Sequence, residues 1–213
     1  MRTVLLAASA AAICAAQTIS IEQLKHPVPP GAAREYRASL NALTKGDLIA
    51  SIAHCRKAID VDPNNASAHN DLGVLFLDNG QIEQALEEFE RATAIQPGLV
   101  AAHLNAGYAF LTMDRPEGAE TSLKKVLEIE RSNRRAHLLL GWCLAIEHQY
   151  TTVALESLQI ASRDYPEAHL AAADVLIHRG AIDAARTEVE AYLATGASDQ
   201  KTLAEAWLRF LTF

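Results

Sequence analysis

Few residues in this chain have the types and spacing that chemistry needs, and Asp174 with His178 is the best candidate pair. Being four residues apart, the two would share one face of a helix, where they could form a hydrogen-bonded acid–base pair. No third group that could act as a nucleophile accompanies them. We therefore favour a solvated polar patch, and keep a small ligand-binding protein or an enzyme built on this pair as the remotest alternative.

A second set of candidate ligands is a series of histidines near the starts of predicted helices. Nitrogen atoms bound to zinc lie about 2.0–2.1 Å from the metal, whereas neighbouring helices pack about 8–10 Å apart. Residues at equivalent places on successive helices therefore cannot easily share one ion, and packing between repeats is the predicted role. The chain also lacks a phosphate-binding loop and the common zinc and hydrolase motifs, so we predict no cofactor, no metal and no catalytic residue. The series consists of His69, His103, His137 and His169.

Composition and charge narrow the class of protein. The formal net charge of −7 disfavours a nucleic-acid partner. Half of the residues are hydrophobic but only 6% are aromatic, which is typical of an alanine-rich helical protein rather than of a β-sandwich. An acidic run at Glu83, Glu87, Glu88 and Glu90 is predicted to form a solvated outer face.

The first sixteen residues have the pattern of a secretory signal peptide (1–16). Arg2 gives a positive start, residues 3–16 form an uncharged run, and Cys14-Ala15-Ala16 offers small residues before Gln17. The run is shorter than the roughly 18 residues of a membrane-spanning helix. We therefore expect an exported protein of the bacterial periplasm, whose mature chain has no transmembrane helix. A lipoprotein attached at Cys14 ranks second, because Ile13 stands where a lipobox has a small residue.

After cleavage two cysteines would remain, Cys55 and Cys143. They lie several predicted helices apart, and a disulfide needs Cα atoms within about 7 Å. We predict that they do not pair and that both are small buried hydrophobic residues.

The rest of the chain shows a repeat of 34 residues. A spacer (17–31) containing Pro27, Pro29 and Pro30 precedes it. Two amphipathic helices per unit are predicted, at 66–79 and 82–95 in the clearest unit, with Gly80 at the turn. Small residues recur in the middle of each first helix and near the start of each second helix, which lets the two helices approach closely. With the 34-residue step, Leu72, Gly73, Phe76, Ala85, Phe89 and Ala92 fall on Ala106, Gly107, Phe110, Ala119, Leu123 and Val126.

Leu72-Gly73, Phe76, Gly80, Ala85, Phe89, Ala92 and Pro97 resemble the signature of the tetratricopeptide repeat (TPR) family. The resemblance implies an all-α fold, a right-handed superhelical solenoid of antiparallel helix hairpins with a C-terminal capping helix. About five repeats are expected in an array over 32–195, followed by a capping helix at 198–213. The repeats span 32–65, 66–99, 100–133, 134–168 with one extra residue in its turn, and a degenerate 169–195.

The same resemblance implies a concave groove, lined by the first helices, that holds a peptide or a helix of a partner. Only Asn105 and Arg135 stand where the family's carboxylate-clamp members would be, whereas Val74 and Leu139 occupy other clamp places, so an acidic chaperone tail is not the expected ligand. An apolar ligand around Tyr108 and Trp142 fits better. The predicted groove consists of Asn70, Val74, Leu77, Leu104, Asn105, Tyr108, Leu111, Arg135, Leu138, Trp142, Ile146, Asp174, Ile177 and His178.

These observations favour a non-enzymatic adaptor, a scaffold that binds a protein partner in its groove. An envelope assembly factor, such as a helper for pilus or outer-membrane machinery, is the alternative. The sequence makes no prediction of the partner's identity or of the oligomeric state. The last helix caps the array in the favoured interpretation, and reaches into the groove in the other.

Overall fold

Regular structure is entirely α-helical across residues 28–211, the part of the chain that this computed structural model describes. The predicted signal peptide, Cys14 and most of the predicted spacer lie outside the described residues. The chain forms two compact units, Met1–Met113 and Asp114–Phe213. No helix in residues 28–211 is both long enough and apolar enough to cross a membrane.

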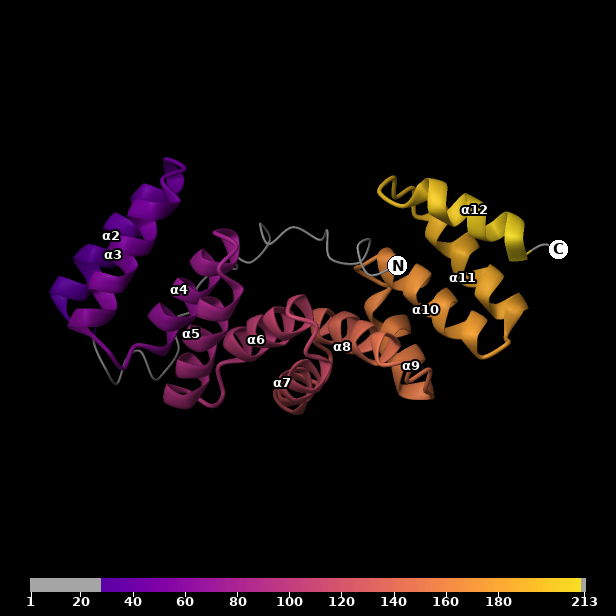
Figure 1. Cartoon of the computed structure of the whole chain (residues 1–213), viewed down its shortest axis with the longest axis horizontal. Helices are drawn as coiled ribbons and strands as arrows, with labels where there is room; N and C mark the ends of the chain where they lie inside the picture. The colour runs from indigo at the N-terminus through magenta and orange to yellow at the C-terminus, as the bar shows by residue number, and fades with distance from the viewer. Residues whose placement is uncertain (1–27, 212–213) are drawn as a thin grey trace. The chain divides into compact units, whose positions relative to one another are not determined.

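Unit 1 contains two helical hairpins and one further helix (Figure 1). Helix α2 (Pro30–Thr44) pairs with α3 (Leu48–Val61), and α4 (Ala66–Asp78) pairs with α5 (Ile82–Ile95). Helix α6 (Val100–Thr112) packs on α5 and touches α4. The first helices, α2, α4 and α6, therefore alternate with the second helices along the chain, as the repeat predicts.

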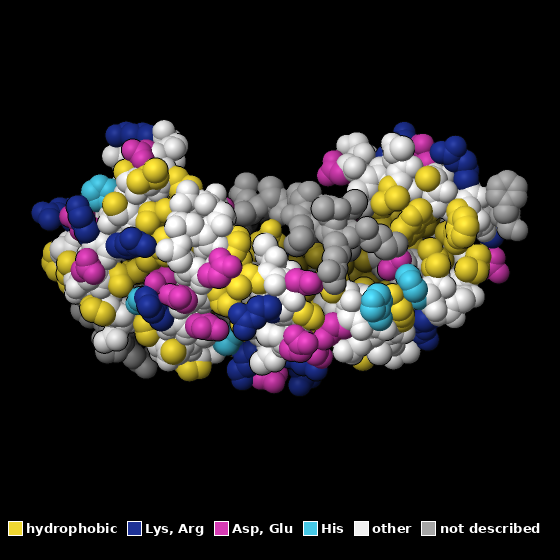
Figure 2. Space-filling view, in the orientation of Figure 1, with side chains coloured by type: hydrophobic (Ala, Val, Ile, Leu, Met, Phe, Trp, Pro, Cys, Tyr) yellow, Lys and Arg dark blue, Asp and Glu magenta, His cyan; other side chains and the backbone are white. Residues whose placement is uncertain are grey.

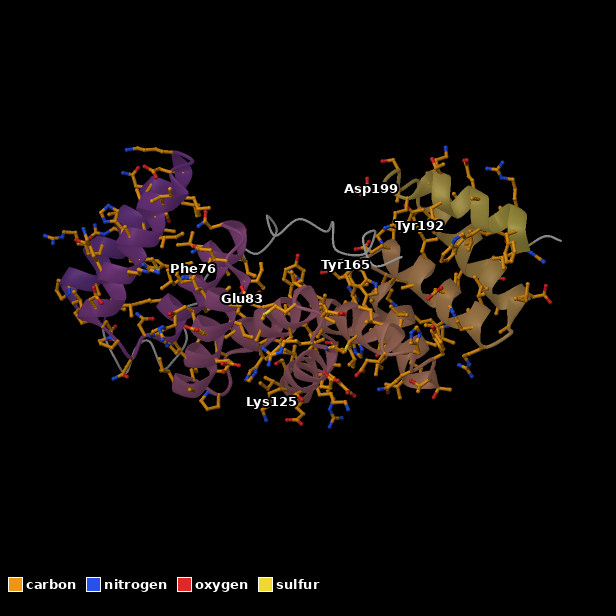
Figure 3. The ribbon with its side chains drawn as sticks, in the orientation of Figure 1. Phe76, Glu83, Lys125, Tyr165, Tyr192 and Asp199 are labelled. Atoms are coloured by element: carbon orange, nitrogen blue, oxygen red, sulfur yellow. The ribbon has the colours of Figure 1, made fainter. Side chains whose placement is uncertain are left out.

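Unit 2 begins with a single helix and continues with two hairpins and an end helix. Helix α7 (Pro116–Ile129) packs on α8 (Arg134–Ile146), which pairs with α9 (Thr152–Ala161). Helix α10 (Glu167–His178) pairs with α11 (Ile182–Ala194), and α12 (Lys201–Leu211) packs on α11. Tyr192 of α11 is labelled beside the start of α12 in Figure 3, and its hydroxyl accepts a hydrogen bond of 2.9 Å from the backbone N–H of Gln200. The all-α hairpin fold is thus confirmed, with α12 covering the last hairpin.

The hairpins are held tightly because small residues face large ones. A Cβ atom on Gly73 would lie 2.5 Å from Cε1 of Phe89, and one on Gly141 would lie 2.6 Å from Cδ2 of Leu158. Real Cβ atoms do not come this close to carbon, so glycine is required at both places. In the first hairpin Ser39 takes this position, and its hydroxyl lies 2.9 Å from the hydroxyl of Ser51.

The turn inside each hairpin needs a residue with positive φ. Gly80 supplies it in the clearest repeat, at φ 74°. In the turn between α8 and α9, where the repeat has one extra residue, His148 adopts φ 56° at the equivalent place. A residue with a Cβ rarely adopts this conformation, which suggests that its surroundings hold it there.

Two helix boundaries differ from the predicted repeat boundaries. Helix α2 starts at Pro30, within the predicted spacer, because a proline at the first helical position lacks an N–H that would have no partner there anyway. Helix α12 starts at Lys201, three residues after the predicted start of the capping helix at residue 198, and the hydroxyl of Tyr192 accepts a hydrogen bond from the backbone N–H of Gln200 just before it.

The close contact at Gly73 predicts the effect of adding one methyl group. Gly73→Ala should lower the free energy of unfolding by about 1–2 kcal/mol, because overpacking costs about 1–3 kcal/mol and the gain in helix propensity returns at most about 1 kcal/mol. Urea unfolding would measure this. Gly98→Ala is the control, since a Cβ there meets nothing within 4 Å, and it should change stability by less than about 0.5 kcal/mol. Equal stability of the two variants would contradict the contact.

Candidate functional site

The predicted groove residues lie on first helices of each unit, α4 and α6 in unit 1 and α8 and α10 in unit 2, and we call these side chains the first-helix surface of each unit. Many of them are more buried than a ligand-binding role requires. Asn70, Leu77, Asn105, Leu111, Leu138 and Trp142 are buried. Val74, Leu104, Tyr108, Arg135, Ile146, Asp174 and Ile177 are partly buried, and His178 is exposed. A partner can therefore contact the partly buried and exposed members over more of their surface than the buried members.

In unit 1 the two asparagines of the first-helix surface belong to a chain of polar side chains that also includes Tyr36 of α2 and Asp71 of α4. The hydroxyl of Tyr36 bonds to the carboxylate of Asp71, and the side-chain amide of Asn70 donates to the same carboxylate at 3.2 Å. The side-chain amide of Asn105 then donates to Asn70 at 3.0 Å. Burial raises the pKa of Asp71, while the bonds from Tyr36 and Asn70 oppose that rise. Asn70 and Asn105, which we expected to be free for a ligand, are thus part of a polar chain that runs from Tyr36 on α2 across three first helices.

In unit 2 the corresponding positions are apolar, and one polar atom among them has no partner. Leu138 and Ala171 are both buried. Trp142, on α8, is 4% exposed, and its indole Nε1 is buried without a hydrogen-bond partner in the described part of the chain. An unpaired buried N–H group costs about 1–3 kcal/mol. This donor is therefore the feature of the first-helix surface that most needs an acceptor.

Asp174 and His178 are brought together, but their side chains do not form a hydrogen-bonded dyad. The imidazole Nδ1 of His178 lies 3.6 Å from Oδ1 of Asp174, and 2.9 Å from the backbone oxygen of Asp174. Burial raises the pKa of the Asp174 carboxyl. Nδ1 of His178 is thus hydrogen-bonded to a carbonyl, which leaves the pair poorly arranged for acid–base chemistry. No group of three metal-ligating side chains occurs in residues 28–211.

The turn between α8 and α9 adds two aromatic residues to this pair that sequence reasoning missed. The ring of Tyr150 stacks on His178 with centroids 4.2 Å apart, and its hydroxyl lies 2.8 Å from Nδ1 of His148. Histidine side chains accordingly lie side by side on this part of unit 2 (Figure 2). The extra residue in the turn was the only signal in the sequence that this hairpin differs from the others.

The recurring histidines hold the connections between repeats. Nε2 of His69, His103 and His137 lies 3.0 Å from the backbone oxygen of Pro63, Pro97 and Arg131, respectively. Each histidine thus ties the start of a first helix to the segment that ends the preceding repeat. The structure gives these residues a hydrogen-bonding role that is more specific than the predicted packing.

Three of the hairpins also carry a histidine–carboxylate pair across their two helices, with a constant separation of 19 residues. His69 lies 2.6 Å from Glu88, and His169 lies 2.7 Å from Glu188. The first hairpin has the same pair reversed, with Glu35 on α2 and His54 on α3 at 2.9 Å. Glu88 is therefore not part of a solvated face, as we expected, because it is buried and also bonds to Arg91.

The two oxygen partners of His69 favour its protonated form. Both of its partners are oxygen atoms, and the backbone oxygen of Pro63 can only accept, so Nε2 donates. A carboxylate also accepts, so Nδ1 donates to Glu88 and the ring carries both protons. The pKa of His69 is accordingly raised, mainly by the bond to Glu88, while burial acts in the opposite direction.

Both described cysteines are free thiols, as predicted. Burial is the main cause that raises the pKa of Cys55 and of Cys143 to about 12. Both thiols are therefore unreactive at neutral pH and act as small packing residues.

Comparison with protein families gives one consistent result. Four tetratricopeptide repeat models match the chain. One matches residues 36–65 and again 100–133, and the other three match residues 54–87, 75–114 and 149–200. A comparison with curated protein sequences finds no match.

Several solved structures of tetratricopeptide repeat proteins have a similar fold. MamA from Desulfovibrio magneticus is 17% identical, with a TM-score of 0.70 over 78% of this chain and 94% of that chain. YrrB, described as a TPR protein with an unusual peptide-binding site, is 17% identical, with a TM-score of 0.68 over 84% and 93%. PilF from Pseudomonas aeruginosa is 20% identical, with a TM-score of 0.68 over 85% and 88%. At these identities the likeness concerns the fold.

The raised pKa of His69 predicts how stability depends on pH. The stabilisation by the pair with Glu88 is fully present below the unfolded pKa of about 6.5, and is lost as the pH rises through the higher folded pKa. Glu88→Gln should therefore lower the free energy of unfolding more at pH 6 than at pH 8, by about 1–2 kcal/mol. Urea unfolding at the two pH values would measure this difference.

The control for this experiment lies in the next repeat. Ser122 stands 34 residues after Glu88, in the hairpin of His103, and carries no charge. Ser122→Ala should show no such pH dependence. If Glu88→Gln were equally destabilising at pH 6 and pH 8, the charged pair would be disproved.

Proposed function

Because the chain belongs to the tetratricopeptide repeat family, we propose that it is a non-enzymatic scaffold that binds a segment of another protein on its first-helix surface. Helical repeat arrays bind partners on extended preformed surfaces rather than in one catalytic cleft. The Asp174 and His178 pair offers no competing site, since the histidine is bonded to a backbone oxygen.

The observation that carries this proposal is the indole N–H of Trp142. It is a buried donor without an acceptor in the described residues, on the face of α8 that the family uses for ligands. A backbone carbonyl of a bound peptide would supply the missing acceptor once the indole, which is 4% exposed, turns toward the ligand. Leu138, four residues earlier on α8, and Leu170 of α10 are buried and apolar. The ligand that fits best is an apolar segment that presents one free carbonyl group beside Trp142.

Unit 1 contributes recognition of another kind. The side-chain amides of Asn70 and Asn105 already take part in hydrogen bonds within the unit. A ligand could use only the amide hydrogens and oxygen lone pairs that these bonds leave over. Tyr108 and Leu104 are partly buried and give this surface apolar contact area. YrrB, the structural neighbour whose description mentions a peptide-binding site, supports a peptide as the class of ligand.

We further propose that the protein works outside the cytoplasm, in the bacterial periplasm, after removal of residues 1–16. The support is the uncharged run of residues 3–16 with small residues before Gln17. A role as an envelope assembly factor is the second candidate, and attachment to lipid at Cys14 would favour it. In either role the partner is a protein.

Trp142→Phe tests the role of the indole N–H with little loss of packing. The free protein should keep its stability within about 1 kcal/mol, because the unpaired donor is removed along with some contact area. Capture of partner proteins from an envelope extract should nevertheless fall about tenfold, since a hydrogen bond in a dry site is worth about 1.4 kcal/mol or more. Chemical unfolding and quantitative pull-down measure the two effects.

The matched control is Trp207→Phe on α12, which makes the same substitution at a tryptophan outside the first-helix surface. It should leave capture unchanged. Undiminished capture by Trp142→Phe would refute the role of its N–H, and undiminished capture by a Tyr108→Ala/Trp142→Phe double variant would refute the first-helix surface as the binding site.

Export is tested by expressing the full chain in a bacterial host. Mass spectrometry of the periplasmic fraction should find a chain that begins at Gln17. Cys14→Ala should leave this product unchanged, because it keeps a small residue at that place. A lipid-modified mass in the original chain, lost in Cys14→Ala, would assign the lipoprotein instead. Retention of residues 1–16 in the cytoplasm would refute export.

A further inference from the structure

A cavity of about 390 Å³ opens between the second helices of the first two repeats, away from the first-helix surface. Its walls come from α3 and α5, and its floor from Leu72 and Phe76 of α4. These two residues are on the opposite face of α4 from Asn70 and Val74, because two residues along a helix turn the side chain by about 200°. The cavity is therefore a separate surface, which the proposed function does not use.

The cavity has an apolar floor and charged walls. Leu72 and Phe76 are buried and Ile59 is partly buried. The part of unit 1 over α3 to α5 accordingly shows basic and acidic side chains beside apolar surface (Figure 2). The remaining lining residues are Arg56, Asp60, Gln84, Glu87, Glu88 and Arg91.

The two arginines of the cavity are already engaged. The guanidinium carbon of Arg56 lies 5.2 Å from the centre of the Phe76 ring, within the range of a cation–π contact. Nη1 of Arg91 lies 2.6 Å from Oε1 of Glu88, and the second oxygen of Glu88 bonds to His69. Arg91, His69 and Glu88 thus satisfy one another within unit 1, whereas Arg56 is held over the Phe76 ring.

The other two carboxylates of the cavity have no such partners. Asp60 on α3 and Glu87 on α5 are exposed, and neither makes a hydrogen bond or an ion pair within the described residues. They belong to different walls of the same cavity. The acidic side chains Glu83 and Glu90 also project from α5 and add to the negative field there. Asp60 and Glu87 are therefore the two carboxylates of the cavity that are left to bond to a ligand, and a cation is the ligand that carboxylates fit.

We infer that this cavity binds an arginine or lysine side chain of a partner protein. The aliphatic part of such a side chain would lie against Ile59 and Leu72, beside the Phe76 ring that Arg56 covers, as long charged side chains do on apolar surface. Its charged end would bond to Asp60 and Glu87 from the two walls, in charge-assisted hydrogen bonds. A partner segment carrying a basic residue could then bind here while another segment occupies the first-helix surface.

The test uses the purified chain and a capped tripeptide, acetyl-Gly-Arg-Gly-amide, followed by methyl and amide NMR. The peptide should shift the methyl signals of Ile59 and Leu72 saturably, with a Kd of about 1 mM, as expected for about −4 kcal/mol from one side chain. Acetyl-Gly-Gln-Gly-amide should cause no saturable shift. Added salt should weaken binding, because both carboxylates are exposed.

The variants are matched in charge. Asp60→Asn with Glu87→Gln should weaken binding at least fivefold, and both side chains are exposed and unpaired, so the fold should be retained. Glu83→Gln with Glu90→Gln makes the same change of net charge at acidic residues outside the cavity. This double variant should weaken peptide binding less than twofold. Three results would each overturn the inference. They are an equal loss of binding in the two double variants, saturable binding of the glutamine peptide, and the absence of a saturable shift with the arginine peptide. Trp142→Phe should leave this binding unchanged, so failure here is distinct from failure of the proposed scaffold role.

Discussion

The structure depends on close contact between the two helices of each hairpin, where a small residue on one faces a large residue on the other. Gly73 against Phe89 and Gly141 against Leu158 leave no room for a Cβ atom. The first hairpin reaches the same closeness with two hydroxyl groups, Ser39 and Ser51. Because this contact uses one face of each helix, the remaining faces are left for the neighbouring repeat and for ligands.

Hydrogen bonds then set each first helix against the segment before it. A turn of irregular backbone between repeats leaves carbonyl groups that need donors. His69, His103 and His137 supply them at one distance, 3.0 Å, in three successive repeats. The reversed pair of Glu35 and His54 indicates that the bond across the hairpin matters more than which helix carries the charge. These histidines therefore have a structural role that explains their recurrence without a metal.

The period of 34 residues was enough to predict the helices, because it records a contact that every hairpin repeats. It could not predict which groove residues are buried, since Leu138 and Trp142 are covered by packing whose geometry depends on side-chain size in the next helix. The polar chain from Tyr36 to Asn105 has a step of 35 rather than 34 residues, because it joins adjacent positions on neighbouring helices. The step of 19 residues between His69 and Glu88 was visible in the sequence, and its reversal at Glu35 and His54 could have identified it.

The cavity between α3 and α5 had no sequence signal, because its lining comes from three helices that only the folded chain brings together. The acidic run on α5 looked uniform in the sequence, yet its members differ in role. Glu88 is buried and holds His69 and Arg91, whereas Glu87 is exposed and unpaired in the part of the chain that the structure describes. One helical step thus separates a structural carboxylate from one that is free to bind a ligand.

The two binding surfaces should differ in how they bind, since one offers a buried donor and the other exposed charges. The N–H of Trp142 has already lost its water, so a ligand that supplies an acceptor removes an existing penalty of about 1–3 kcal/mol. Asp60 and Glu87 are exposed and hydrated, so a cation must displace water before it gains the ion pair, and the net gain for exposed pairs is about 0–1 kcal/mol each. Affinity should therefore come mainly from the first-helix surface, while the cavity adds selectivity for partners that carry a basic residue at the right distance.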